Sequence, residues 1–265
     1  MFLSKDPKKF LIRTAYEVKR YRILMRVIPI VLSAVTLFTS TIYVIAVMYD
    51  KYGSYTVSIN KLDNIDYQLA LSEERNFNTM TSRLNARAGE KITNISVNDL
   101  PNDLDMIDGS HNGANYVAYT YYMKNVGKRT VKTEYLLYIV NVTQNLDKAV
   151  RIRLYINGEP STYARTKSDG TGAEDGCEEF ISATTISRRQ LPTTAPGDVV
   201  KFTVVIWIEG DDIDCTDDLI GGTFKIDMKI SIVAVDEDGD GIIDSDYSST
   251  EESKSAEAES DDNSD

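Results

Sequence analysis

The sequence predicts an all-β protein, an antiparallel β-sandwich of the jelly-roll or immunoglobulin-like type that stands outside the cell behind one N-terminal transmembrane helix. Three observations carry this prediction. Residues 27–49 contain no charged side chain. Between residues 50 and 235, about eight short segments alternate polar and apolar residues and are separated by turn sequences, which is typical of antiparallel sandwiches. From residue 236 the chain is acidic and poor in apolar residues.

The N-terminal part reads as a basic cytosolic segment, residues 1–22, followed by a membrane span, residues 23–49. The uncharged run is long enough to cross a bilayer with some tilt, and it lacks a polar face. Residues 1–49 carry eight Lys and Arg side chains and two acidic ones, and the basic residues all precede or open the span. Because positive flanks stay in the cytosol, the rest of the chain is expected outside. A cleaved signal peptide is the alternative, but its basic and apolar parts would be unusually long, so we predict an uncleaved signal-anchor in the cell membrane.

Strands are expected throughout the exterior domain, residues 50–235, with one face of each sheet packed inward and the other facing water. Asn157-Gly158 suits a tight hairpin turn. Residues 64–90 are polar with poor periodicity, and we interpret them as a short helix near 67–76 followed by a long loop. The expected strands cover residues 55–59, 116–126, 131–143, 149–158, 161–165, 179–191, 199–210 and 222–235.

Both cysteines of the chain, Cys177 and Cys215, lie in the predicted exterior. A disulfide between them is the expectation for an oxidising compartment, with two free thiols as the alternative. Two cysteines and one histidine do not form an ordinary zinc site. Cys215 lies in the segment 207–222, which contains six acidic residues. We interpret this segment as a disulfide-pinned connection between the two strongest strands, ahead of a contribution to calcium binding or to catalysis.

Residues 236–244 follow the spacing of an EF-hand-type calcium loop. Asp236, Asp238 and Asp240 stand at positions 1, 3 and 5, with Asp244 at position 9 and a glycine at position 6. Position 12 is Tyr247, so the usual bidentate Glu is missing. The spacing predicts a weak Ca²⁺ site, and Ca²⁺ is the only cofactor expected. The alternative is a solvated spacer within an acidic disordered tail, residues 236–265.

Catalysis has little support in the sequence. His111 is the only histidine and lies in a polar turn before a strand. The patterns G-x-S-x-G and H-E-x-x-H are both absent, and no pair of carboxylates stands out. We therefore assign no catalytic residue and do not expect an enzyme. No exterior segment is basic, so nucleic acid is not expected as a partner.

Three segments resemble the TasA/camelysin-like surface proteins of Gram-positive bacteria, in an uncharacterised membrane-anchored branch. They are VVIWIEGDDIDCTDDLIGGTFKIDMKI (204–230), SRLNAR (82–87) and DGSHNGANYVAYTYYMKNVG (108–127). The resemblance covers about residues 52–235 and implies a jelly-roll-like sandwich, export and, in some members, fibres assembled by strand exchange. Camelysins have been labelled metalloproteases, but no metal-binding His/Glu motif is present here, so that activity is not carried over.

Together these observations predict a membrane-anchored structural or adhesive module that binds itself or another surface protein. Residues 55–59 follow the span closely and are the natural segment for strand exchange. A Ca²⁺- or carbohydrate-binding surface sensor is the alternative, and a carboxylate-based envelope hydrolase is less favoured.

Overall fold

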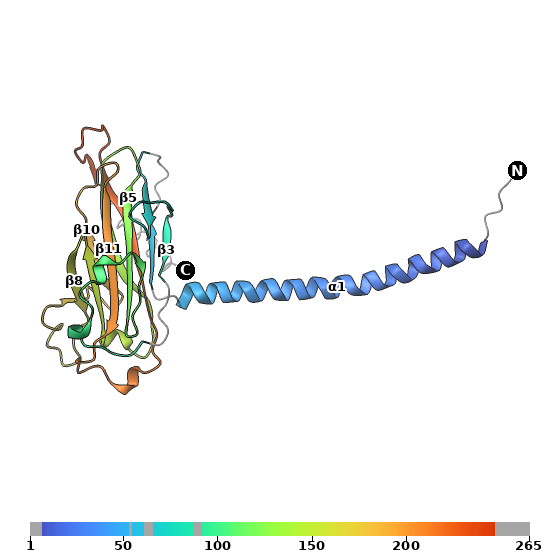
Figure 1. Ribbon diagram of the computed structural model, residues 1–265, viewed down its shortest axis with the longest axis horizontal. Helices are drawn as coiled ribbons and strands as arrows, with labels where there is room; N and C mark the ends of the chain where they lie inside the picture. The colour runs from blue at the N-terminus through green and yellow to red at the C-terminus, as the bar shows by residue number, and fades with distance from the viewer. Residues whose placement is uncertain (1–6, 53–54, 61–65, 87–91, 247–265) are drawn as a thin grey trace, which may run out of the picture. The chain divides into compact units, whose positions relative to one another are not determined.

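A computed structural model describes residues 7–52, 55–60, 66–86 and 92–246. The chain divides into two compact units, residues 1–51 and 52–265. The first is a single helix and the second is built of strands (Figure 1). Each unit is described here by itself.

The first unit is α1, Pro7–Tyr52. It contains the predicted span and is longer, because the helix continues back through the basic segment to Pro7. Residues 18–44 are long and apolar enough to cross a membrane, as a signal anchor or a signal sequence would. The hydroxyl groups of Ser and Thr donate to carbonyl oxygens three or four residues earlier, for example Thr36 to Leu32 at 2.8 Å and Thr41 to Leu37 at 2.8 Å. Polar side chains satisfied within the helix are tolerated in an apolar surrounding.

The second unit is a sandwich of two mixed sheets. The first sheet has the strand order β10-β6-β12-β1-β3, with β13 on β12. The second has the order β2-β5-β11-β7-β8-β9, with β4 on β5. The strands are β1 (Tyr55–Ile59), β2 (Leu69–Ser72), β3 (Arg83–Asn85), β4 (Gly109–Ser110), β5 (Tyr116–Asn125), β6 (Val131–Val142), β7 (Val150–Ile156), β8 (Glu159–Ala164), β9 (Glu178–Glu179), β10 (Thr185–Gln190), β11 (Val199–Ile208), β12 (Phe224–Val235) and β13 (Ser245–Asp246).

Single-turn 3₁₀ helices lie in the connections: η1 (Val97–Asp99), η2 (Leu104–Met106), η3 (Leu146–Lys148) and η4 (Asp217–Leu219). The predicted turn at Asn157 and Gly158 is confirmed. It joins β7 to β8 with both residues at positive φ, 53° and 92°, as a two-residue hairpin turn requires.

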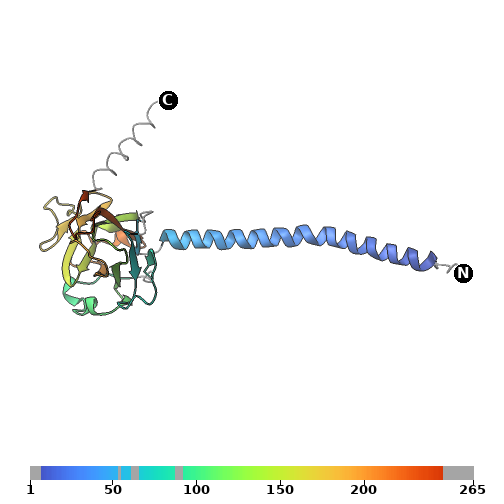
Figure 2. The ribbon, with the colours of Figure 1, turned by 90° about the horizontal axis from the view of Figure 1, so that it is seen from above.

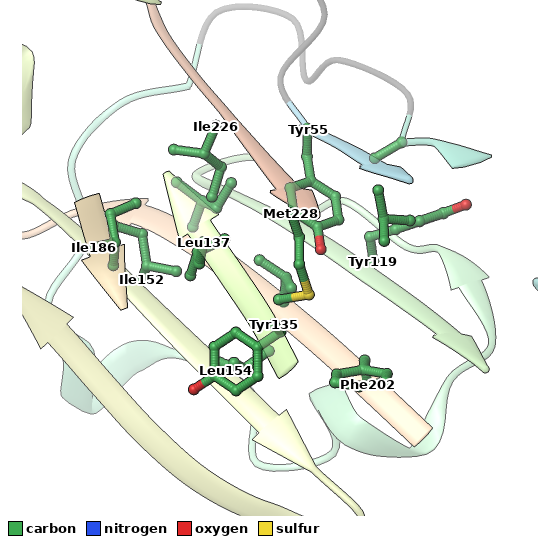
Figure 3. Packing of buried hydrophobic residues seen from close by; sticks show 14 of the residues in the cluster. Tyr55, Tyr119, Tyr135, Leu137, Ile152, Leu154, Ile186, Phe202, Ile226 and Met228 are labelled. Carbon is green, nitrogen blue, oxygen red and sulfur yellow. The ribbon is translucent and has the colours of Figure 1, made fainter. Parts of the chain in front are cut away.

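The two sheets face each other, as the view along the strands shows (Figure 2), and the buried apolar side chains of the core lie between them. It is formed by the inward residues of every long strand, among them Leu137 of β6, Phe202 of β11 and Met228 of β12 (Figure 3). Seven of the eight predicted strands are confirmed, with their ends moved by at most two residues. The predicted strand 179–191 is instead two strands, β9 and β10, which belong to different sheets. Tyrosines fill much of the core, and Tyr119 and Tyr121 are almost completely buried.

Two expectations about the strands are wrong. The sheets are mixed rather than purely antiparallel, because β1 runs parallel to β12 and β8 runs parallel to β9. The expected helix near residues 67–76 is also absent from the described residues, where β2 pairs with β5 instead. Ala70, Leu71 and Ser72 of β2 are all buried. A strand that is covered on both faces lacks the alternation of polar and apolar residues by which a half-buried strand is identified.

The outer face of the second sheet is not simply solvated. The segment 95–108 crosses it and covers a second apolar cluster that includes Trp207, Val205 and Leu104. Asp105 ties this segment to the sheet, accepting from Thr203 at 2.6 Å and pairing with Lys201 at 3.1 Å. Trp207 is buried as a result, and its ring lies under the guanidinium of Arg153.

The folded unit continues past residue 235, where the tail was expected to begin. Residues 236–244 form a closed loop, and β13 then pairs with the end of β12. The remaining tail residues, 247–265, lie outside the described part of the chain.

Candidate functional site

The first candidate site is the position of β1 between β12 and β3, which we call the β1 slot. Both sides of β1 are paired: residues 55–59 lie opposite 226–230 of β12, and residues 56–58 lie opposite β3. Ala86 donates to the Tyr55 carbonyl oxygen at 3.0 Å, and Asn60 donates to the Ile230 carbonyl oxygen at 2.9 Å. Removing β1 would leave one edge of β12 unpaired, which is a template for another strand.

The inward side chains of β1 complete the core. Tyr55, Val57 and Ile59 are 1%, 0% and 9% exposed. Burying each such side chain stabilises the fold by roughly 1.5–3 kcal/mol. β1 therefore contributes both backbone hydrogen bonds and a continuous apolar surface, although it is not part of a β-hairpin. Backbone pairing and side-chain burial are also what binds a peptide strand that is added to the edge of a sheet.

The second candidate site is the acidic loop 236–244 at the end of β12. The structure brings together three of the four predicted ligands: carboxylate oxygens of Asp236, Asp238 and Asp244 all lie within 4.8 Å of one another. The fourth, Asp240, is not part of that group, and its carboxylate accepts from the Ile242 amide at 2.7 Å. Three converging carboxylates are a ligand set that Ca²⁺ prefers.

Hydrogen bonds close this loop around Asp236. Its side chain accepts from the Gly239 amide at 2.6 Å and from the Gly241 amide at 3.0 Å, and it is 2% exposed. The Asp244 carboxylate accepts from Glu237 at 3.0 Å. Each carboxylate oxygen keeps a further lone pair for a cation, so the loop holds its ligands together by its own backbone.

Positive charge lies beside the same loop. A cavity of about 490 Å³ is lined by Lys128 and Arg129 as well as by Asp236 and Asp240. Gly239 has a φ of +88°, and a side chain there would overlap the Arg129 guanidinium. Lys128 and Arg129 would repel a cation bound in this loop and so weaken its binding.

The acidic connection 209–222 serves to join neighbouring segments. Asp211 accepts from Ser96 Oγ at 2.7 Å, and Asp214 accepts from the Ser168 amide at 2.9 Å. The bond from Ser168 lowers the pKa of Asp214. These acids accept hydrogen bonds from segments that are distant in sequence, which ties the connection to its neighbours.

Asp212 is the buried member of this connection. Its carboxylate pairs with the Arg151 guanidinium, and both side chains are 1% exposed. Arg151 also binds Glu174 at 3.1 Å. Burial lowers the pKa of Arg151, but the hydrogen bond and charge of Asp212 more than offset this and raise it.

The expected disulfide is not formed, because Cys177 and Cys215 are both free thiols. The two segments are tied together in another way. Glu174 accepts from the Cys177 amide and Asp212 accepts from the Cys215 amide through their carbonyl oxygens, at 2.9 and 3.0 Å, and both acids bind Arg151. The ion pairs of Arg151 therefore connect the two segments for which the sequence predicted a disulfide bond. Burial raises the pKa of Cys177, which favours the protonated thiol at neutral pH.

His111 contacts the segment 95–108 that covers the second sheet. Its ring nitrogens lie 2.9 Å from the carbonyl oxygens of Gly109 and Leu104. The contact with Leu104 joins β4 to η2, so the side chain has a structural role.

Sequence reasoning missed Arg151 as a key residue. The alternation of residues in β7 places Arg151 on a solvated face together with Arg153, but Arg151 is buried and pairs with Glu174 and Asp212, which lie on two remote loops. No local pattern carries this information, because the covering residues are distant in sequence.

No model of a known protein family matches the chain, and no curated protein sequence matches it either.

Proposed function

We propose that the protein is a membrane-anchored surface module of the TasA/camelysin-like type, with a jelly-roll-like domain outside the cell, that binds a second copy of itself through β1. The observation that carries the proposal is the β1 slot. β1 begins three residues after α1 ends and belongs to no hairpin, yet it is paired on both sides and buried in the core. A strand so placed is able to complete the sheet of a neighbouring copy with the same contacts.

The first test is strand complementation. The chain lacking residues 55–59 is mixed with a labelled peptide of residues 52–60, and binding is followed by fluorescence anisotropy. We expect saturable binding, and no binding of a matched peptide with Val57→Asp, because that change places a carboxylate in the core. A truncated chain that keeps its β-sheet circular dichroism and binds neither peptide would overturn the proposal. Light scattering of the intact chain in detergent, across a concentration series, then shows whether exchange produces growing assemblies.

A second function is favoured by the acidic loop: weak Ca²⁺ binding that stiffens the end of β12. The supporting observation is the convergence of Asp236, Asp238 and Asp244. Extracellular Ca²⁺ modules bind with dissociation constants of about 10⁻⁴–10⁻³ M.

Calcium titration tests this function. With a dissociation constant near 1 mM, 10 mM CaCl₂ is expected to stabilise the folded chain by about 1.4 kcal/mol, seen as binding heat and as a raised melting temperature. Asp238→Asn with Asp244→Asn is expected to abolish both signals, while the control Asp261→Asn with Asp262→Asn in the tail leaves them unchanged. The absence of heat and of a thermal shift in the unmodified chain dismisses the calcium function.

A further inference from the structure

The register of β1 is only partly fixed by its apolar pattern. Tyr55, Val57 and Ile59 face the core, while Thr56 and Ser58 face outward. A shift by one residue would place Thr56 and Ser58 in the core, so the pattern excludes it. A shift by two residues is different, because it leaves Val57 facing the core together with either Tyr55 or Ile59.

Tyr55 is the inward side chain that a two-residue shift would misplace most. It is the only aromatic residue of β1, and it extends into the core beside Met228 (Figure 3). Its ring lies 6.1 Å from the ring of Tyr119 and 6.2 Å from that of Tyr121, centre to centre. Neither valine nor isoleucine fills the volume of a tyrosine ring, so a shifted strand would leave a void or force the ring into a smaller space.

A buried chain of polar atoms adds direction to this fit. The hydroxyl groups of Tyr55 and Tyr121 lie 2.8 Å apart, and Tyr121 donates to the Met228 sulfur at 2.9 Å. Because the Tyr121 hydroxyl proton goes to Met228, the Tyr55 hydroxyl group donates to the Tyr121 oxygen. In a shifted strand the Tyr121 oxygen would lose that partner inside the core, where an unmade hydrogen bond is unfavourable.

We propose that Tyr55 sets the register of β1, and that the β1 slot accepts strands with a tyrosine at the first position and aliphatic residues at the third and fifth. A second copy of this chain carries that pattern. The part of this inference that concerns a second copy rests on the proposed strand exchange, whereas the part that concerns register holds within one chain.

Cysteine cross-linking measures the register in the full chain, in detergent and with Cys177→Ser and Cys215→Ser. Ser58→Cys with Arg83→Cys reports the native register, because these positions are directly opposite. Ser58→Cys with Asn85→Cys reports a two-residue shift, because these positions are diagonal in the native register and too far apart for a disulfide. Each pair is oxidised with copper phenanthroline in dilute solution, and the yield is read by mass spectrometry of proteolytic fragments.

With Tyr55 in place, we expect the native pair to cross-link at least tenfold more than the shifted pair. Tyr55→Val is expected to lower this ratio by about tenfold or more, and Tyr55→Phe is expected to lower it less. The control is Tyr135→Val, a change of the same size at an equally buried tyrosine of β6, which should leave the ratio unchanged. An unchanged ratio in folded Tyr55→Val overturns the inference. If that variant does not fold, Tyr55→Phe decides, and an unchanged ratio there overturns it equally.

The proposed exchange is tested separately, by adding a peptide with Tyr55→Val to the chain lacking residues 55–59. Binding of the unmodified peptide at least tenfold tighter than this variant supports the inference in trans, and equal binding overturns that part. Failure of every peptide to bind rejects strand exchange, while the cross-linking ratio within one chain still decides the register.

Discussion

Above pH 10 the strand-built unit is expected to unfold within a few pH units, although its tyrosines leave its stability unchanged between neutrality and about pH 9. Burial raises the pKa of Tyr55, Tyr119, Tyr121 and Tyr135 well above the ordinary value near 10. Between pH 10 and these raised values, the unfolded chain loses each tyrosine proton and the folded chain keeps it. Stability therefore falls as pH rises, by about 1.4 kcal/mol per pH unit for each tyrosine.

Four such tyrosines together give a slope of roughly 5–6 kcal/mol per pH unit. This is comparable to the whole stability of a small domain, about 5–15 kcal/mol. Urea unfolding followed by circular dichroism from pH 8 to 12 measures the slope, and tyrosinate absorbance shows when the phenols ionise. The buried phenols are expected to ionise together with unfolding. Tyr135→Phe removes one of these ionisations and should reduce the slope by about 1.4 kcal/mol per pH unit. Ionisation of all phenols near pH 10 in a chain that is still folded would contradict the prediction.

Arg151→Met is expected to destabilise the strand-built unit by about 3–5 kcal/mol, because it leaves the buried Asp212 carboxylate without its cation. Arg151 also donates to the Val150 and Lys148 carbonyl oxygens, at 3.2 and 3.3 Å, so several acceptors lose their donor. Chemical denaturation gives the change in unfolding free energy. Labelling of Cys177 and Cys215 by a thiol reagent should accelerate, since the segments that Arg151 holds are then released.

Two controls separate this effect from the loss of any surface charge. Arg188 pairs with Glu134 at 2.7 Å on a side chain that is 44% exposed, and Arg188→Met should change stability by at most about 1 kcal/mol. Arg151→Met combined with Asp212→Leu should recover much of the loss, because the uncompensated charge is gone. A loss below about 1 kcal/mol for Arg151→Met alone would show that Asp212 finds water or another partner.

The sequence was sufficient where local alternation decides the structure. The strands β5, β6, β7, β11 and β12 lie where alternating residues placed them, since one face of each packs on the core. The hairpin at Asn157 and Gly158 follows in the same way from backbone conformation. The spacing of acids in 236–244 also located the loop in which three carboxylates converge.

Pairing between distant segments could not be read from the sequence. The partner of β1 depends on which sheet edge is free, and nothing within YTVSI distinguishes parallel pairing with β12 from a hairpin. The burial of Arg151 depends in the same way on two remote loops. Cys177 and Cys215 suggested a covalent bond by their number and compartment, whereas the connection between their segments is ionic.

The parallel alignment of β1 and β12 has a mechanical consequence. β1 is entered from the α1 side at Tyr55, opposite Ile226, whereas the chain leaves β12 at Val235, at the far end of the same pair of strands. Once the two-residue pairing of β13 with β12 has opened, tension between the helix and the C-terminal tail would pull β1 and β12 in opposite directions along their length. Such a load is shear, in which the hydrogen bonds between β1 and β12 resist together instead of opening one after another. The same strand that is proposed to exchange between copies is thus oriented to bear force when it stays in its own chain.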